Sequence, residues 1–98
     1  SHPRSQRLMR YELQRKGVAE EDIQRAIKTS APDQELALRA AENYYRRLTG
    51  YDFKVFRNRL SGFLARRGFS YEVIAPVVAA LWGQRSANNN TDEENEEE

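Results

Sequence analysis

The sequence contains no cysteine and only one histidine, His2, among its 98 residues. Without cysteine the chain forms no disulfide and no thiolate metal site, which suits a reducing, cytoplasmic location. With its one histidine next to the first residue, the chain has no internal histidine for metal binding or acid–base catalysis. No apolar run approaches the roughly 20 residues of a membrane span. Information on fold and function therefore lies in surface charge and helix packing.

The net charge of +1 conceals a strong asymmetry along the chain. All sixteen lysine and arginine residues lie in residues 1–85 together with nine acidic residues, so this body carries about seven net positive charges. The other six acidic residues lie in the closing stretch SANNNTDEENEEE. Such a separation is typical of chains that bind an anionic partner. A solvated helical surface followed by a solubilising tail would have the same composition.

Apolar residues recur at helical spacing along residues 4–84, which predicts an all-α fold of about five helices. The third helix is expected over residues 33–48, with Pro32 at an early helical position, where proline is tolerated. Gly17 and Gly68 follow the first and fourth helices, where a left-handed C-terminal cap is favoured. From residue 85 onward the chain is rich in Asn and Glu and almost free of apolar residues. We expect this part to be a disordered acidic tail over residues 85–98.

A fifteen-residue stretch occurs twice. LQRKGVAEEDIQRAI, residues 13–27, aligns without a gap with LARRGFSYEVIAPVV, residues 64–78, fifty-one positions later. Five of the fifteen aligned positions are identical and four more are similar. Each copy reads as a helix end, a basic pair, a glycine and an acidic helix start. The repetition predicts tandem three-helix repeats in an elongated arrangement, with a core shared between stacked neighbours.

The domain organisation follows from this repeat. Residues 4–28 are expected to be the last two helices of one three-helix repeat, and residues 30–84 a complete one. Residues 1–3, Ser-His-Pro, are typical of the remnant of a cleaved affinity tag. The first repeat lacks a first helix, so an apolar stripe is left partly uncovered. We expect this stripe to pack on the following repeat or on a second copy of the chain; its members are Leu8, Leu13, Ile23 and Ile27.

Two stretches resemble a known family. RSQRLMRYELQRKGVAEEDIQRAI, residues 4–27, resembles the middle repeat of the RecX family, the regulatory proteins of the RecA recombinase. RNRLSGFLARRGFSYEVIAPVV, residues 57–78, resembles the final repeat of that family. The first match is carried by Glu12-Leu13, Arg15-Lys16-Gly17 and Val18. The second is carried by Leu60, Phe63, Leu64, Arg66, Arg67, Gly68, Phe69 and Glu72. Family members usually carry three repeats, whereas this chain holds about one and two-thirds.

The resemblance implies a cytoplasmic protein that binds RecA filaments. It further implies modulation, mostly inhibition, of the ATPase, strand exchange or growth of these filaments in recombination, DNA repair and the SOS response. Some members of the family also bind DNA, so single- or double-stranded DNA is an alternative partner. In that alternative the chain is a DNA-binding helical module whose arginines contact phosphates. The resemblance implies no membrane association.

The residues themselves favour binding over catalysis. There is no glycine-rich phosphate loop, and most acidic residues of the body lie where predicted helices begin, where the helix dipole explains them. We therefore expect no enzymatic activity, no catalytic residues, no cofactor and no metal. The candidates for partner binding are basic residues on predicted helices and at their ends: Arg7, Arg10, Arg15, Lys16, Arg46, Arg47, Arg57, Arg66 and Arg67. The two basic pairs before glycine are also explained by dipole complementation at helix C-termini. Phe53, Phe56, Phe63 and Phe69 are expected in the core.

Overall fold

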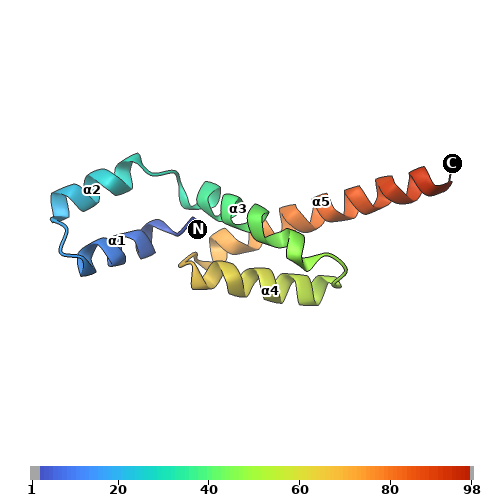
Figure 1. The fold of residues 1–98 in the computed structure, drawn as a ribbon, viewed down its shortest axis with the longest axis horizontal. Helices are drawn as coiled ribbons and strands as arrows, with labels where there is room; N and C mark the ends of the chain where they lie inside the picture. Colours follow the sequence, from blue (N-terminus) through green and yellow to red (C-terminus); the bar gives the residue numbers. More distant parts are fainter. Residues whose placement is uncertain (1–2, 98) are drawn as a thin grey trace.

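The computed structural model describes residues 3–97 of the chain, with side-chain environments for residues 3–85. Within this range the fold is all-α and elongated, about 61 Å long and 23 Å across, which confirms the prediction (Figure 1). The elements are α1 (Gln6–Arg15), α2 (Glu20–Thr29), α3 (Asp33–Tyr44), the 3₁₀ helix η1 (Tyr45–Leu48), α4 (Phe53–Arg66) and α5 (Tyr71–Glu97). Residues 1 and 2 of the expected tag remnant lie outside the described residues.

Local sequence signals account for the helix starts. The hydroxyl of Ser5 accepts a hydrogen bond from the amide of Leu8 at 3.0 Å, and the carboxylate of Asp52 accepts one from the amide of Val55 at 3.0 Å. Both are N-caps, which satisfy amides that the first helical turn leaves without partners. Pro32 is the N-cap of α3 rather than a residue within its first turn. The predicted helix over residues 33–48 tightens into 3₁₀ geometry after Tyr44.

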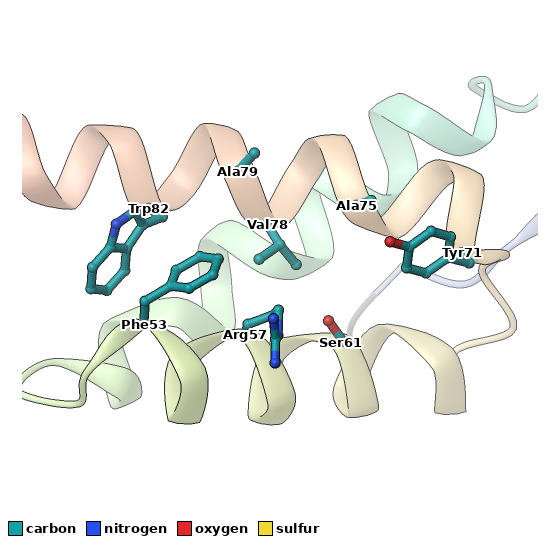
Figure 2. Close-up of a pocket in the computed structure, with 8 residues that line it drawn as sticks. All are labelled: Phe53, Arg57, Ser61, Tyr71, Ala75, Val78, Ala79 and Trp82. Atoms are coloured by element: carbon teal, nitrogen blue, oxygen red, sulfur yellow. The ribbon is translucent and has the colours of Figure 1, made fainter.

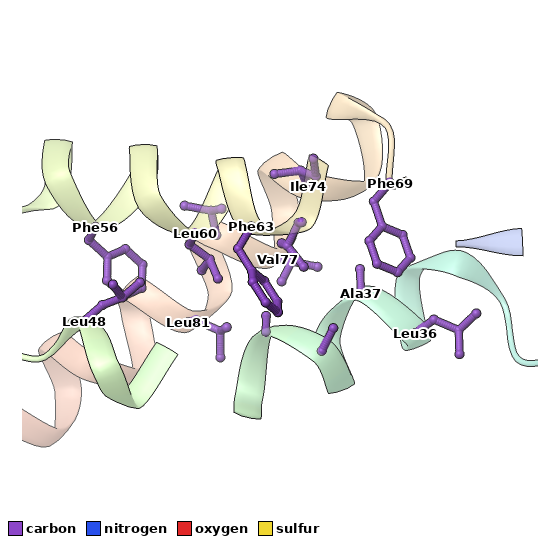
Figure 3. Packing of buried hydrophobic residues seen from close by; sticks show 14 residues of the cluster. Leu36, Ala37, Leu48, Phe56, Leu60, Phe63, Phe69, Ile74, Val77 and Leu81 are labelled. Atoms are coloured by element: carbon purple, nitrogen blue, oxygen red, sulfur yellow. The ribbon is translucent and has the colours of Figure 1, made fainter. Parts of the chain in front are cut away.

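A single apolar core lies between α3, α4 and α5 (Figure 3). Phe56, Leu60 and Leu64 of α4 are completely buried, and steps of four residues place them on one face of the helix. Three alanines of α3, Ala37, Ala40 and Ala41, are also completely buried. The remaining members are Leu36, Leu48, Phe63, Phe69, Ile74, Val77, Val78 and Leu81. Burying a side chain of this size contributes about 1.5–3 kcal/mol, so this bundle supplies most of the apolar stabilisation.

The end of α5 differs from the prediction. Disorder was expected from residue 85, but the helix continues to Glu97 and extends past the other helices (Figure 1). Residues 86–97 contain neither glycine nor proline. Extending a helix that is already nucleated costs far less than starting one, so nothing in the local sequence stops α5 after its packed part. Residue 98 of the predicted tail lies outside the described residues.

The two glycine corners are built alike. The amide of Gly17 donates a hydrogen bond to the carbonyl of Gln14 at 3.0 Å, and the amide of Gly68 donates one to the carbonyl of Ala65 at 2.9 Å. The donors of the two corners are fifty-one positions apart in the sequence, and so are the acceptors. The residue after each glycine donates to a helix carbonyl in the same register. Both glycines have positive φ, +80° and +91°, as a left-handed cap requires. The repeated sequence thus forms a repeated joint, while the division of the chain near residue 29 stays a prediction.

The start of α1 is docked against the second corner. The amide of Ser5 donates to the carbonyl of Arg67 at 3.0 Å, and the guanidinium of Arg7 donates to the carbonyl of Gly68 at 3.2 Å. A Cβ added at Gly68 would collide with the hydroxyl of Ser5 and lie 2.9 Å from Cβ of Leu8. The same addition at Gly17 would meet nothing within 4 Å. Gly68 therefore serves both as a helix cap and as a site of close backbone approach.

Gln6 connects α1 to the link between α2 and α3. Its amide donates to the carboxylate of Asp33 at 2.8 Å, and its side-chain amide donates to Ser30 Oγ at 3.0 Å and to the carbonyl of Ala31 at 3.1 Å. The apolar stripe of α1 and α2 is less well covered. Ile23 is 1% exposed, but no residue of α1 is buried. Only the beginning of α1 thus packs on the following unit, and self-association through the remaining face stays a prediction.

The two corners make a matched test of this docking. We expect Gly68→Ala to reduce the free energy of unfolding by about 1–3 kcal/mol more than Gly17→Ala does. Both variants incur the left-handed strain of about 1–2 kcal/mol, but only Gly68→Ala also overpacks against Ser5 and Leu8. Urea unfolding followed by circular dichroism measures both. Equal losses would show that the close approach at Gly68 contributes nothing.

Candidate interaction surface

Helix α4 carries positive charge and no negative charge within its own sequence. From Phe53 to Tyr71 the chain has no aspartate or glutamate. The five cations of this stretch are Lys54, Arg57, Arg59, Arg66 and Arg67, and we call them the α4 basic face. Its cations are exposed except for Arg67, which is half-buried, because the core uses the opposite side of the helix.

Four carboxylates of the described side chains form ion pairs, and each pairs with a cation outside α4. The ion pairs are Arg4 with Glu12, Arg10 with Glu20 at 2.5 Å, Arg25 with Asp22 at 3.3 Å, and Arg39 with Glu35 at 2.6 Å. All of them lie in the segment that ends with α3, and among the described residues none involves a cation of α4. Exposed pairs of this kind stabilise the fold only by about 0–1 kcal/mol, but each one offsets a positive charge. The uncompensated charge therefore concentrates on α4.

The candidate residues of α1 differ in whether they already have a partner within the chain. Arg10 is paired with Glu20, and Arg7 donates to the Gly68 carbonyl, so both already have partners within the chain. Arg15 lies 5.8 Å from the ring centroid of Tyr11. Lys16, the C-cap residue of α1, is exposed. Arg7 and Arg10 are thus less available to a partner than the sequence suggested.

The other candidates lie on η1 and at α4, where three guanidinium groups rest on aromatic rings. Arg47 lies over Tyr44 at 5.9 Å, Arg57 over Phe53 at 5.6 Å and Arg67 over Phe63 at 5.4 Å. Arg46 and Arg66 are exposed on η1 and at the end of α4. Resting a guanidinium on a ring restrains it while its hydrogen-bond donors stay available.

The two basic pairs that precede Gly17 and Gly68 do not form one patch. Arg15 and Lys16 lie at the α1–α2 corner, at the far end of the long axis (Figure 1). Arg66 and Arg67 lie at the α4–α5 corner, nearer the middle of the molecule (Figure 1). The pairs are equivalent by repeat position, yet they would contact separate places on a partner.

A groove runs between α4 and α5 on the side away from α3 (Figure 2). Its volume is about 390 Å³, and its lining is mostly apolar. We call it the α4–α5 groove; Phe53, Arg57, Ser61, Tyr71, Ala75, Val78, Ala79 and Trp82 line it. An adjoining hollow of about 520 Å³ shares Arg57, Ser61 and Tyr71 with the groove and extends it toward the Gly68 corner.

The sequence of α3, α4 and the first part of α5 matches a known protein family. Residues 32–78 match the family description "RecX, third three-helix domain". This interval begins at the N-cap of α3 and runs through α4 into α5. The match covers 47 of the 98 residues, and over this part the chain is similar to the RecX family. No curated protein and no solved structure matches the chain.

The family assignment fits the architecture. RecX is a family of regulatory proteins of the RecA recombinase, and residues 32–78 of this all-α chain match its third three-helix domain. All five cations of the α4 basic face lie inside the RecX domain, whereas Ala79 and Trp82 of the groove lie just beyond it. Within the described residues we find no cluster of metal-ligand side chains and no helix long and apolar enough to cross a membrane.

Two features of the surface around α4 and α5 were not predicted. Phe53 was expected in the core, but it is 40% exposed at the rim of the groove because it lies in the first turn of α4, beyond the core residues. Arg85 was not a candidate, yet it lies 4.8 Å from the Trp82 ring centroid and donates to the carbonyl of Tyr51 at 2.6 Å. The absence of acidic residues between positions 53 and 71 is the sequence signal that could have identified α4 as the basic surface.

The affinity of the chain for a polyanion should depend more on unpaired cations than on cations already paired with carboxylates. We expect the double variant Arg57→Gln/Arg59→Gln to elute from heparin resin at clearly lower salt than the double variant Arg10→Gln/Arg25→Gln. Each variant removes two positive charges, but Arg10 and Arg25 are already paired with carboxylates. Elution of the two variants at the same salt concentration would contradict a special role for the α4 basic face.

Proposed function

We propose that this chain binds RecA filaments and modulates, mostly inhibits, their ATPase, strand exchange or growth in recombination and DNA repair. The observation that carries the proposal is the RecX third three-helix domain with an uncompensated basic face on α4. The RecX family regulates RecA, and a fixed array of exposed cations provides the physical means to hold an acidic surface.

The mechanism we propose is stoichiometric binding without a chemical step. An elongated rod offers contacts at several places along a repetitive partner, so many weak contacts add up to a stable complex. The α4 cations would attract acidic side chains and speed association. The rigid three-helix core would hold these cations at fixed positions, which lowers the entropy lost on binding. Such a protein acts in the cytoplasm, beside the DNA that RecA coats.

A second candidate function is DNA binding. The observation that favours it is the same face: five cations and no carboxylate between residues 53 and 71. Guanidinium groups bind phosphate as readily as carboxylate, so charge alone supports either partner. In this alternative the chain would contact phosphates with little preference for sequence.

RecA activity tests the first proposal directly. We expect the chain to lower RecA-dependent ATP hydrolysis on single-stranded DNA, and Arg66→Glu/Arg67→Glu to reduce this effect by about tenfold or more in effective concentration, since charge reversal replaces attraction with repulsion. The measurement is the ATPase rate against concentration of the chain.

The control for that experiment reverses the same number of charges elsewhere. Arg25→Glu/Arg39→Glu changes exposed residues of α2 and α3 and should leave the effect within about twofold of the wild-type value. Circular dichroism establishes that both variants stay helical. An unaltered ATPase rate at saturating wild-type chain would refute the proposed regulation.

Salt dependence separates the two candidate partners. If the α4 basic face binds phosphates, affinity for single-stranded DNA should fall steeply with salt, with a logarithmic slope near −0.7 for each phosphate contact. Filament binding should instead require RecA, and salt should slow it more than weaken it. Fluorescence anisotropy on labelled oligonucleotides, bare and coated with RecA, measures both. Equal affinity for bare and coated DNA would favour the DNA-binding module.

A further inference from the structure

The α4–α5 groove combines an apolar floor with one unpaired cation. Phe53, Val78 and Trp82 supply apolar surface, and Tyr71 at the other end is 79% exposed (Figure 2). Arg57 is the only charged residue among those that line the groove. Within the described side chains no carboxylate pairs with it, and its guanidinium lies over the ring of Phe53.

This lining specifies what the groove can bind. Apolar side chains along the groove would remove the exposed faces of Phe53 at one end and Tyr71 at the other from water, which is the main source of affinity in such sites. A carboxylate next to one of these side chains would meet Arg57 beside an apolar surface, where the attraction exceeds that between fully solvated charges. The complementary ligand therefore carries large apolar side chains with an acidic side chain close to one of them.

The dimensions fit a short peptide segment. Phe53 and Ser61 are eight residues apart on α4, so their Cα atoms lie about 12 Å apart along the helix axis. The adjoining hollow continues past Ser61 to Ala65, about one further turn. Two to three turns of an amphipathic helix, seated between α4 and α5, would cover this length.

The contacts of the aromatic rings in the groove argue against nucleic acid as the molecule that binds there. Bases stack on free ring faces. Phe53 has Arg57 over its ring and contacts Trp82 in an edge arrangement at 5.2 Å. Trp82 also has Arg85 over its ring at 4.8 Å and contacts Phe56 at 5.2 Å. Among the described side chains, Tyr71 is the one ring of the groove lining without an aromatic or cation contact, so successive bases would find no platform.

We infer that the α4–α5 groove is a docking site for an acidic amphipathic segment of a protein partner. Its apolar side chains lie between Phe53 and Tyr71, and its carboxylate pairs with Arg57. The identity of that partner as RecA rests on the proposed function, whereas the chemistry of the segment rests on the groove alone. Trp82 is the only tryptophan of the chain, so its fluorescence reports directly on occupation of the groove.

Neighbouring alanines of α5 provide matched variants. Ala79 and Ala80 are both exposed, but only Ala79 lines the groove. Ala79→Phe fills the groove, and Ala80→Phe adds the same side chain to the adjacent surface. Both keep Trp82 as the sole tryptophan. Arg57→Gln and Arg39→Gln form a second pair, since each removes one positive charge and only Arg57 lines the groove.

The probe for the groove is a synthetic amphipathic helix of leucine and glutamate, with a leucine and lysine version as its control. We expect the glutamate peptide to shift Trp82 emission to shorter wavelength and the lysine peptide to leave it unchanged. Ala79→Phe and Arg57→Gln should each weaken this binding by about tenfold, as loss of a central anchor does. Ala80→Phe and Arg39→Gln should stay within about twofold of wild type.

Other results of this titration would overturn the inference. It fails if the glutamate peptide leaves Trp82 emission unchanged, or if Ala79→Phe and Ala80→Phe bind the peptide equally. It also fails if oligothymidylate shifts the emission and the peptide does not, because the groove would then bind nucleic acid.

Co-sedimentation with RecA-coated DNA distinguishes this inference from the proposed function. Weaker sedimentation of Ala79→Phe than of Ala80→Phe supports the groove as the filament contact. If wild type binds the glutamate peptide but does not sediment with filaments, the proposed function fails and the groove stands. If all variants sediment equally while the peptide titration fails, the groove inference is wrong and the proposed function stands.

Discussion

Complete burial of one side of α4 is the constraint on which the rest of the surface depends. Phe56, Leu60 and Leu64 recur every four residues and pack against α3 and α5. Because a helix is a rigid rod with a fixed angular period, this burial holds the residues between them, among them Arg57 and Arg59, toward solvent. The core thus fixes where the positive charge of the domain lies.

Aromatic rings connect that core to the charged surface. Tyr44 stacks on Phe63 with ring centroids 4.1 Å apart, and Phe56 contacts Trp82 at 5.2 Å. Guanidinium groups lie over the outer members of this set, Arg57 over Phe53 and Arg85 over Trp82. Long basic side chains that cover apolar surface in this way keep their charge in water while losing part of their conformational freedom. A partner then meets cations that are already partly ordered.

Much of the fold was readable from local rules. Helical spacing and the glycines at residues 17 and 68 predicted the number and order of helices, because each rule acts within a few residues. The resemblance of two stretches to RecX repeats also pointed to the family that residues 32–78 match. Local rules failed at the end of α5, where no stop signal meant that a packed helix could continue.

The sequence by itself determined the helices, the repeated corner and the excess of positive charge between residues 53 and 71. Only the tertiary structure decided which cations are free. Arg10 and Arg57 look alike in the sequence, yet Arg10 reaches Glu20 of the neighbouring helix, while Arg57 faces an apolar groove. The same holds for the two glycines, since only Gly68 has another helix against it. Pairing and close approach depend on residues that are distant in the chain and meet only when the helices pack.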